Sequence, residues 1–532
     1  MTTSAPIPVA DVCLILEGTY PFVTGGVSSW VHDLIVGMPD VTFALLHISA
    51  SRSLSHEPRY KMPPNVVSFV ECFVHDPVVH DDRCPRWTPG RVRTLWKTLD
   101  RFHKAPMDHK GEPFAQMMAD YAVPRTRVVN TKDLLLSKTS WRYLVDSYQQ
   151  RNPSGSFIDF FWTWRAVHMP IFQIINAETP PARIYHLVST GYAGLAGIVA
   201  KVRTGKPLLL TEHGIYVKER KIEINRADWI YSEPEKVVTV KTRPSVLKEI
   251  WIDNFLVLGK LCYDYCDQIF TLYGGNQDLQ VEFGARRELL DIIPNGVKMD
   301  IFGPLRDVPR PNDGIRRVGF VGRVVPIKDV KCFIKGCKLC ADKVPNVEFL
   351  ILGPTDEDQQ YFKECEALVE MLGMQDKIKF YGRVNVREYY PKLDIFVLTS
   401  ISEGQPLTIL EAACSGVPTV STNVGSCSEL LLGRTEEDKA IGPSGIITNI
   451  GQPRETGEAL ARLLKDEDLR QQMIKNGFER IERYYRQDGV IKRYHDVYDK
   501  WLQRAEGRGE APPRAGAERP KTPGSRAAQG AA

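Results

Sequence analysis

The stretch SEGQPLTILEAACSGVP, residues 402–418, decides the fold, because it follows the apolar run DIFVLTS at 394–400 and opens into a helical pattern. Glu403 falls in the loop, and Glu411, eight residues on, lies one to two turns inside the helix. Pro406 suits the first helical turn, and the backbone N–H groups at 405–408 would face an anion. The two carboxylates could accept hydrogen bonds from hydroxyl groups of a ligand, and the free amides between them could bind its phosphate. The alternative is a loop glutamate and a solvated helix glutamate, since short motifs match by chance.

Short apolar runs alternate with helical patterns on both sides of this stretch. Buried strands that alternate with helices predict parallel, doubly wound sheets, and the chain holds two such sets. The expected strands are 9–16, 183–188, 207–211, 267–272 and 289–294 in the first set, and 315–323, 347–353, 378–383, 394–400 and 417–422 in the second. Ligands of such sheets bind beyond the carboxyl ends of the strands, so the loops there should carry the function.

The sequence predicts two Rossmann-like domains that face each other across a cleft. Residues 1–297 form the first, with an insertion at about 50–150, and residues 298–486 form the second. A hinge is expected at 294–311, which is rich in Pro, Gly and Asp. A helix at 487–505 is expected to pack back toward the first domain, and the tail 506–532 lacks large apolar residues and is predicted to be disordered.

Composition excludes several classes of protein. The 532 residues carry a net charge of only +4, which argues against a dedicated nucleic-acid binder. The 11 cysteines are scattered rather than arranged as the framework of a small secreted scaffold. The first residues show no basic stretch followed by an apolar segment, and no run reaches the ~18 apolar residues that span a bilayer. We therefore expect a cytoplasmic protein.

A second motif, GRVVPIKD at 322–329, follows the first strand of the second set and places Arg323 and Lys328 five residues apart. Two fixed cations can neutralise the charge that develops on a departing diphosphate, in place of a metal ion. Solvated loop charges are the alternative, because Lys and Arg are mostly on surfaces. The position at a strand end favours function. No Asp-x-Asp stands near such a strand end, so we expect no metal and no other cofactor.

These motifs resemble those of the family-4 retaining glycosyltransferases, which have the GT-B fold. The matching residues are Gly322-Arg323…Lys328, Glu403-Gly404…Glu411-Ala412, Gly416-Val417-Pro418 and the linker Pro294-Asn295-Gly296-Val297. In the first half, EGTYPFVTGGVSSWV (17–31), FFWTWR (160–165) and LTEHGIYVKER (210–220) resemble the cytoplasmic glycosyltransferases of bacterial Pel-type exopolysaccharide synthesis. The resemblance covers roughly residues 10–505.

The resemblance implies a role for each matched residue. Arg323 and Lys328 would hold the diphosphate, Glu411 the ribose and Glu403 the donor sugar, while the loop 381–384 would contact the base. The implied catalytic residues are His213, Glu403, Arg323 and Lys328. The implied donor-binding residues are Gly25, Gly26, Arg323, Lys328, Arg383, Glu403, Gly404, Gln405, Pro406, Leu407 and Glu411.

Two features of the first half have competing explanations. Gly25 and Gly26 follow the first strand, where a missing Cβ lets a phosphate or sugar approach, but a turn that needs a positive φ explains them equally well. His213 ends a strand and should face the cleft, where an imidazole can bond the donor sugar or a developing oxocarbenium ion. A lone histidine is more often structural, although the match of residues 211–214 to the family favours a site role.

Three further groups point more weakly to function. The aromatic stretch FIDFFWTWR, 157–165, could offer ring faces to an acceptor glycan, but such a stretch is more often core. Cys337 and Cys340 have the spacing of half a zinc site without a second pair, so buried small side chains are favoured. A cluster of His75, His80, Asp81, Asp82 and Cys84 in the insertion is only a remote metal candidate.

By this resemblance, the protein moves a hexose or N-acetylhexosamine from a UDP-sugar to a growing glycan, with retention at the anomeric carbon. The expected partners are the UDP-sugar, the glycan acceptor and membrane-embedded polysaccharide synthase subunits, which would tether it at the inner membrane; no nucleic acid is expected. One alternative is a nucleotide-sugar epimerase on the same fold. The other is a non-catalytic subunit that tethers a synthase complex, against which the intact motif residues argue.

Overall fold

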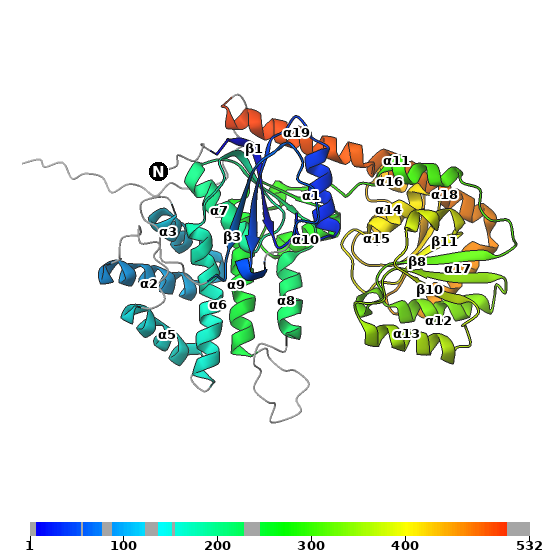
Figure 1. The fold of residues 1–532 in the computed structure, drawn as a ribbon, viewed down its shortest axis with the longest axis horizontal. Coiled ribbons are helices and arrows are strands. Elements are labelled where there is room, and N and C mark those ends of the chain that lie inside the picture. The colour runs from blue at the N-terminus through cyan, green and yellow to red at the C-terminus, as the bar shows by residue number, and fades with distance from the viewer. Residues whose placement is uncertain are drawn as a thin grey trace, which may run out of the picture.

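The computed structural model describes residues 7–54, 57–76, 88–122, 137–151, 155–227 and 245–507. They form two α/β domains that lie side by side, each built on its own sheet (Figure 1). Both sheets are wholly parallel and carry helices on both faces, as the alternation of strands and helices predicted. The predicted tail lies outside the described residues from 508 onward, and the helix before it ends at Ala505.

The first sheet has the strand order β3-β2-β1-β4-β5-β6-β7. The strand order reverses between β1 and β4, so the loops after these two strands flank the place where ligands of such sheets bind. Two strands were not among the expected ones: β2, and β3, which lies within the insertion at about 50–150 and pairs with β2. The strands are β1 (Ala10–Glu17), β2 (Phe43–Ser49), β3 (Val66–Phe73), β4 (Ala182–Leu187), β5 (Leu208–Glu212), β6 (Gln268–Thr271) and β7 (Leu290–Ile292).

Helices cover the first sheet unequally. Cys13 and Ile15 of β1 face a large core that contains the helices of the insertion, whereas Val12 and Leu14 face a smaller core beneath α1 and α19. The insertion adds α2, α3 and α5 to the larger side. The helices are α1 (Gly26–Val36), α2 (Pro89–Lys104), α3 (Gly111–Tyr121), α5 (Lys138–Arg151), α6 (Phe157–Asn176), α7 (Tyr192–Thr204), α8 (Tyr216–Arg226), α9 (Val246–Tyr265) and α10 (Gly274–Glu282).

The last helix, α19 (Gln487–Ala505), returns from the second domain and packs on the first sheet (Figure 1). A buried polar chain holds it there: the Tyr498 hydroxyl lies 2.6 Å from His186 Nδ1, and His186 Nε2 lies 2.9 Å from the Thr211 hydroxyl. The Tyr494 hydroxyl lies 3.1 Å from the same Thr211 oxygen. Because these polar groups bond one another, the cost of their desolvation is offset, and they fix α19 on the sheet.

The second sheet has the order β10-β9-β8-β11-β12-β13 and reverses between β8 and β11. Its last strand, β13, was not among the expected ones. The strands are β8 (Arg316–Val321), β9 (Val347–Leu352), β10 (Ile378–Gly382), β11 (Ile395–Leu398), β12 (Thr419–Thr422) and β13 (Gly445–Thr448). The helices are α11 (Met299–Phe302), α12 (Val330–Ala341), α13 (Gln359–Met371), α14 (Leu407–Cys414), α15 (Cys427–Leu432), α16 (Glu436–Lys439), α17 (Pro453–Lys465) and α18 (Glu467–Tyr484).

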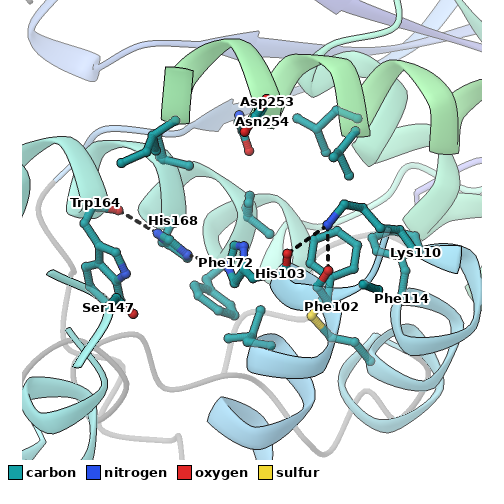
Figure 2. A pocket seen from close by; sticks show the side chains of 18 of the residues that line it. Phe102, His103, Lys110, Phe114, Ser147, Trp164, His168, Phe172, Asp253 and Asn254 are labelled. Carbon is teal, nitrogen blue, oxygen red and sulfur yellow. Dashed lines mark hydrogen bonds between the residues drawn. The ribbon is translucent and has the colours of Figure 1, made fainter. Parts of the chain in front are cut away.

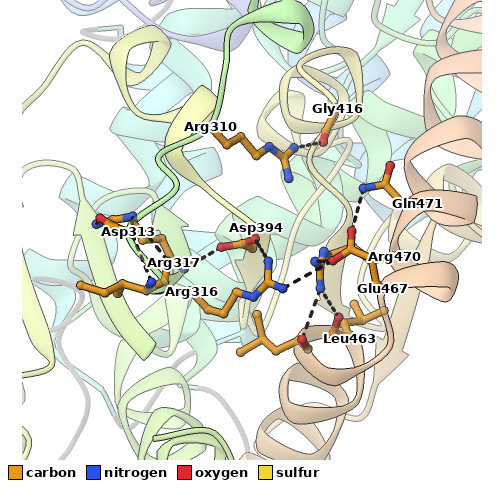
Figure 3. A network of polar contacts seen from close by, with 12 residues as sticks. Arg310, Asp313, Arg316, Arg317, Asp394, Gly416, Leu463, Glu467, Arg470 and Gln471 are labelled. Carbon is orange, nitrogen blue, oxygen red and sulfur yellow. Dashed lines mark hydrogen bonds and ion pairs between the residues drawn. The ribbon is translucent and has the colours of Figure 1, made fainter. Parts of the chain in front are cut away.

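An ionic network ties the second sheet together at the end where its strands begin (Figure 3). The Asp394 carboxylate, just before β11, accepts bonds from the Arg316 side chain at 3.0 Å and the Arg317 amide at 2.8 Å. Arg316 also pairs with Glu467, which in turn pairs with the buried Arg470. These charges lie opposite the loops that end the strands, so we interpret the network as structural.

The chain crosses between the domains twice, and the two crossings lie against each other. The Val297 amide donates to the Tyr485 carbonyl at 2.8 Å, and the Gln487 amide donates to the Val297 carbonyl at 3.0 Å. A Cβ on Gly296 would lie 2.5 Å from Gln487 Cα, so only glycine permits this approach. The pair of crossings lies within the predicted hinge region and just before α19.

Candidate active site between the two domains

The loops after β8 and β11 bring together the first two predicted site residues. Lys328 Nζ donates to Glu403 Oε1 at 2.5 Å, and the Ser400 hydroxyl donates to the same oxygen at 2.5 Å. Both charged side chains are largely buried, with 21% and 13% of their surfaces exposed. An ion pair with so little solvent contact is screened much less than a surface pair. The Lys328 ammonium therefore has a fixed position at the switch point of the second sheet.

The turn that presents Lys328 is held by strained backbone and by the neighbouring strand. Asp329 has a φ of +43°, which non-glycine residues rarely adopt, and its side chain caps α12 through the Cys332 amide. The Thr399 hydroxyl, just after β11, lies 3.1 Å from the Lys328 carbonyl oxygen and 3.0 Å from that of Asp329. Strain of this kind persists where surrounding contacts fix it, often at functional sites.

Arg323 lies on the same loop but points elsewhere. Its guanidinium bonds Glu357 Oε2 at 2.7 Å, and 52% of the side chain is exposed. The loop after β9, which carries Glu357, packs tightly against the loop of Arg323. A Cβ on Gly353 would lie 2.0 Å from the Gly322 carbonyl oxygen, so the two backbones are in close contact. Arg323 thus lies at the rim of the site and does not pair with Glu403, the partner of Lys328.

Glu411 lies inside α14 and is held by a tyrosine that the sequence reasoning missed. The Tyr390 hydroxyl donates to Glu411 Oε2 at 3.0 Å, and Tyr390 itself is fully buried. Burial raises the pKa of Glu411, while the hydrogen bond from Tyr390 partly opposes this rise. Tyr390 follows the strand β10 in the sequence YYPKLD, and nothing in that spacing singles it out.

The start of α14 differs in detail from the prediction. The helix begins at Leu407, and Pro406 is the residue before it rather than part of the first turn. Because proline has no N–H, only the amides of Gln405, Leu407 and Thr408 can face an anion there. The buried Gln405 side chain instead accepts a bond from the Asn295 amide at 2.7 Å, so it fastens the domain linker.

The first domain contributes the N-terminus of α1. Gly25 has a φ of 167°, which is ordinary extended backbone, and Gly26 is the first residue of the helix. A Cβ on either glycine would meet no atom within 4 Å. The turn that needs a positive φ is therefore excluded as their explanation, and the open backbone agrees with close approach of a ligand. Gly26 and Leu407 line one small interdomain cavity of about 50 Å³.

His213 follows β5 and meets the second domain. A Cβ on Gly404 would lie 3.3 Å from the His213 carbonyl oxygen, so the loop of Glu403 touches His213. Within the described residues neither ring nitrogen of His213 has a hydrogen-bond partner, although both are buried. Burial lowers the pKa of His213 to about 4, so the imidazole is neutral at pH 7, and it packs 4.7 Å from the Trp30 ring. Buried polar groups without partners are rare and mark candidate ligand contacts.

A carboxylate from each domain adds to the site region, and neither was predicted. Glu17 ends β1 and accepts bonds from the Tyr192 amide at 2.9 Å and the Tyr216 hydroxyl at 2.6 Å, beside the switch point of the first sheet. Glu429 of α15 accepts a bond from the Gly274 amide at 2.9 Å, across the domain boundary. The spacing of these residues in the sequence gives no sign of either contact.

The remaining sequence candidates lie outside this cluster. Arg383 is exposed after β10, and Tyr381 beside it is 39% exposed. The aromatic stretch is divided: Phe160 and Trp164 are core, whereas Trp162 is exposed.

The cysteine and metal candidates give no site in the described part of the chain. Cys337 and Cys340 are buried in α12, as their helical pattern predicted. Of the suggested metal cluster, His80, Asp81, Asp82 and Cys84 fall outside the described residues, and elsewhere no group of three or more His, Cys, Asp or Glu side chains is arranged to hold a metal ion. Among the helices that the structure describes, none is long and apolar enough to span a bilayer.

Comparison with known proteins assigns both halves of the chain. Residues 10–288, more than half of the chain, match the family model described as a domain of unknown function (DUF3492). Residues 304–480 match the model of the glycosyl transferases group 1. These two matches correspond to the two sheets, and the second includes Arg323, Lys328, Glu403 and Glu411.

Curated relatives match over part of the chain. The mannosylfructose-phosphate synthase of Agrobacterium fabrum is 29% identical over 257 residues, 45% of this chain and 53% of that protein. The capsular polysaccharide biosynthesis glycosyltransferase CapM of Staphylococcus aureus is 25% identical over 198 residues, 36% of this chain and 48% of that protein. The chain spans about half the length of the curated relatives it matches.

Solved structures share the fold over nearly the whole chain. HepE of Anabaena, solved in complex with UDP, gives a TM-score of 0.54 at 14% identity, and covers 92% of this chain and 99% of its own. The sucrose-phosphate synthase of Thermosynechococcus elongatus gives 0.54 at 13% identity, with the same coverage. The predicted GT-B architecture is confirmed. The chain therefore belongs to the DUF3492 family and carries, in a GT-B fold, the domain of the group 1 glycosyltransferases.

Proposed function

We propose that this protein transfers a hexose or N-acetylhexosamine from a UDP-sugar to a growing glycan, with retention at the anomeric carbon. One observation carries the proposal: Lys328 and Glu403 are paired at the switch point of the second sheet, and the loop of Glu403 touches His213 of the first domain. A cation, a carboxylate and a neutral imidazole thus meet between the domains. HepE, which shares the fold, was solved with UDP, and this supports a UDP-sugar as the donor here.

In this proposal the second domain binds the nucleotide. Lys328 contacts the diphosphate, and Arg323 leaves the exposed Glu357 to contact it from the rim. The amides at the start of α14 face the phosphates, and Glu411, fixed by Tyr390, accepts bonds from the ribose hydroxyls. Two cations then neutralise the charge that develops on the leaving diphosphate, so we propose that no metal ion or other cofactor is needed.

The sugar would lie between Glu403 and His213. Glu403 accepts bonds from sugar hydroxyls while it keeps Lys328 in place, and the unpaired ring nitrogens of His213 bond the sugar from the other domain. Gly25 and Gly26 leave room for the donor beside α1. The departing phosphate oxygen takes the proton of the acceptor hydroxyl on the face it leaves, which retains the configuration. Closure of the cleft, across which the loop of Glu403 touches the first domain, would exclude water from the reaction.

The pathway is proposed from the motifs of the first domain. EGTYPFVTGGVSSWV, FFWTWR and LTEHGIYVKER resemble those of Pel-type exopolysaccharide glycosyltransferases, so we propose a role in synthesis of such a polymer on the cytoplasmic side of the membrane. Membrane-embedded synthase subunits would then take over the product.

A donor screen tests the proposal. The thermal midpoint of the purified chain is measured with UDP, GDP and ADP and with their sugars. A ligand at a hundred times its Kd adds about 2.7 kcal/mol to stability. We expect UDP and UDP-sugars to raise the midpoint and the other nucleotides to leave it unchanged. A shift by GDP or ADP alone would contradict the donor. An isomerised sugar nucleotide formed without acceptor would instead identify an epimerase, and binding without turnover would identify a tethering subunit.

A further inference from the structure

A second cavity lies within the helices inserted into the first domain. Its volume is about 290 Å³, and α2, α3, α5, α6 and α9 enclose it (Figure 2). Of these helices, α2, α3 and α5 lie on the side of the first domain that faces away from the second domain (Figure 1). The cavity shares no lining residue with the candidate active site, so the transfer reaction does not explain it.

A neutral pair of histidines forms one wall of this cavity. His168 Nδ1 lies 2.7 Å from the Trp164 carbonyl oxygen, which can only accept, so Nδ1 carries the proton. His168 Nε2 is then an acceptor, and His103 Nε2, at 3.1 Å, must donate to it. Burial lowers the pKa of His168 to about 4 and that of His103 well below its usual value. The pair therefore brings no charge to the cavity.

Cations and hydrogen-bond donors around the cavity outnumber the anionic acceptors. Lys110 Nζ donates to the carbonyl oxygens of Phe102 at 2.7 Å and His103 at 3.2 Å, which leaves it a third N–H. Arg151, the exposed last residue of α5, lines the cavity without an ion pair to any described residue, and Asn254 Nδ2 is buried and unpartnered within the same part of the chain. Asp253 is the one carboxylate in the described lining. Two cations and an amide thus face a single anion.

The rest of the lining is apolar and largely aromatic. Phe114, Trp164, Phe172, Val257 and Leu258 contribute to it, and all five are buried. A volume of about 290 Å³ is at the lower end of the range of small-molecule sites. It therefore accommodates one apolar chain of moderate length, and a lipid with two chains is too large.

We propose that this cavity binds a small single-chain amphiphile with an anionic head group. The head group accepts bonds from Lys110, Arg151 and Asn254, which balances the excess of positive charge and satisfies the buried amide. The chain lies among the aromatic and aliphatic side chains. A carboxylate and a phosphate offer the same acceptor chemistry, so a fatty acid and a phosphorylated lipid precursor are both sources of such a ligand. This site is independent of the proposed transfer of sugar.

Calorimetry on the full chain tests the proposal with three ten-carbon probes, each kept below its micelle-forming concentration. These are decanoate, decyl phosphate and decanol, which differ only in the head group. We expect one site for at least one of the two anions, and binding of decanol weaker by a factor of about 10 or more. The tighter anion identifies the head group. Equal binding of decanol, or no binding of either anion, would overturn the proposal.

Variants then locate the site. Arg151→Met should weaken anion binding by a factor of about 10, whereas Arg142→Met, on the same helix but outside the cavity lining, should leave it unchanged. Val257→Phe and Ile171→Phe fill the cavity from two helices, and each should abolish binding. Circular dichroism and UDP binding serve as folding controls, since neither depends on this cavity. Undiminished decanoate binding in both folded filling variants would place the ligand elsewhere and overturn the assignment.

Discussion

Lys328 Nζ lies 2.5 Å from Glu403 Oε1, and this contact joins the two loops that flank the switch point of the second sheet. Lys328 follows β8 and Glu403 follows β11, two strands that pair side by side although 75 residues separate the two side chains. The Ser400 hydroxyl bonds the same carboxylate oxygen and limits its movement. The cation that we assign to the leaving diphosphate therefore has its position fixed by the residue that we assign to the sugar.

Lys328→Ala should reduce kcat by about 100- to 1000-fold, because the ammonium matters most when charge develops on the departing phosphate. Lys331→Ala is the matched control. Lys331 lies three residues after Lys328 in the sequence and pairs with Glu364 instead of Glu403. Steady-state kinetics of UDP release measure both variants. A kcat within a few fold of wild type for Lys328→Ala would remove this residue from the mechanism.

Tyr390→Phe should weaken UDP binding several-fold, because Glu411 loses the hydrogen bond that orients it toward the ribose. Loss of one such bond is worth about 0.5–1.5 kcal/mol, which corresponds to a factor of about 2 to 13 in affinity. The neighbouring Tyr389→Phe serves as control, since Tyr389 is half-buried and packs against Tyr381, whereas Tyr390 is the tyrosine that bonds Glu411. Calorimetric titration with UDP distinguishes them. Equal affinities would mean that Tyr390 only packs the core.

His213 should make the protein less stable in acid. Its pKa is about 4 in the folded chain and about 6.5 when unfolded, so between these values the unfolded chain binds more protons. Stability therefore falls as the pH drops from 6.5 toward 4, and His213→Asn should reduce this dependence. The thermal midpoints at about pH 5 and about pH 8 measure it.

His495 provides a control of opposite sign. The Asp40 hydrogen bond raises the pKa of His495. The stability that protonated His495 contributes is therefore fully present below about pH 6.5, and it is lost as the pH rises through the raised pKa. His495→Asn should therefore lower the midpoint in acid and leave it unchanged at alkaline pH. If His213→Asn gave this same pattern, the burial of a neutral His213 would be contradicted.

Truncation after Gly507 should leave stability and turnover unchanged, because residues 508–532 contain no Leu, Ile, Val, Phe, Trp, Tyr or Met to pack. The cut keeps Glu506, which pairs with Arg183 of β4. Removal of α19 from Gln487 onward should instead prevent folding, since Tyr494, Tyr498 and Trp501 complete the smaller core of the first domain. Differential scanning calorimetry compares the two. A large loss of stability in the shorter truncation would mean that the tail packs.

Alternation of strands and helices was sufficient to predict both sheets, because buried parallel strands read as short apolar runs. It missed β2 and its neighbour β3, whose residues mostly alternate between half-buried and exposed at the edge of the sheet, and the short β13. Motif spacing placed Lys328 and Glu403 at strand ends, and topology then brought them together. The motif did not predict the role of the Gln405 side chain, which bonds the domain linker and leaves only the Gln405 amide for a ligand.

Contacts between distant segments lay beyond the reach of sequence reasoning. Tyr390 bonds Glu411 across 21 residues, and Glu429 caps α10 of the other domain. The cavity between α2, α6 and α9 is also invisible in the sequence, where the aromatic stretch at 157–165 only suggested a core. Such contacts depend on how helices cross, which local patterns do not determine.

Release of UDP from a UDP-sugar in the presence of excess EDTA tests the central claim most directly. We predict that the wild-type chain releases UDP at a rate that EDTA does not change, because Arg323 and Lys328 neutralise the diphosphate. Glu403→Ala should still bind UDP. It should form UDP from the UDP-sugar about 100-fold more slowly, since a misplaced sugar reacts poorly. Activity that EDTA abolishes and manganese restores, or full activity in Glu403→Ala, would contradict the account.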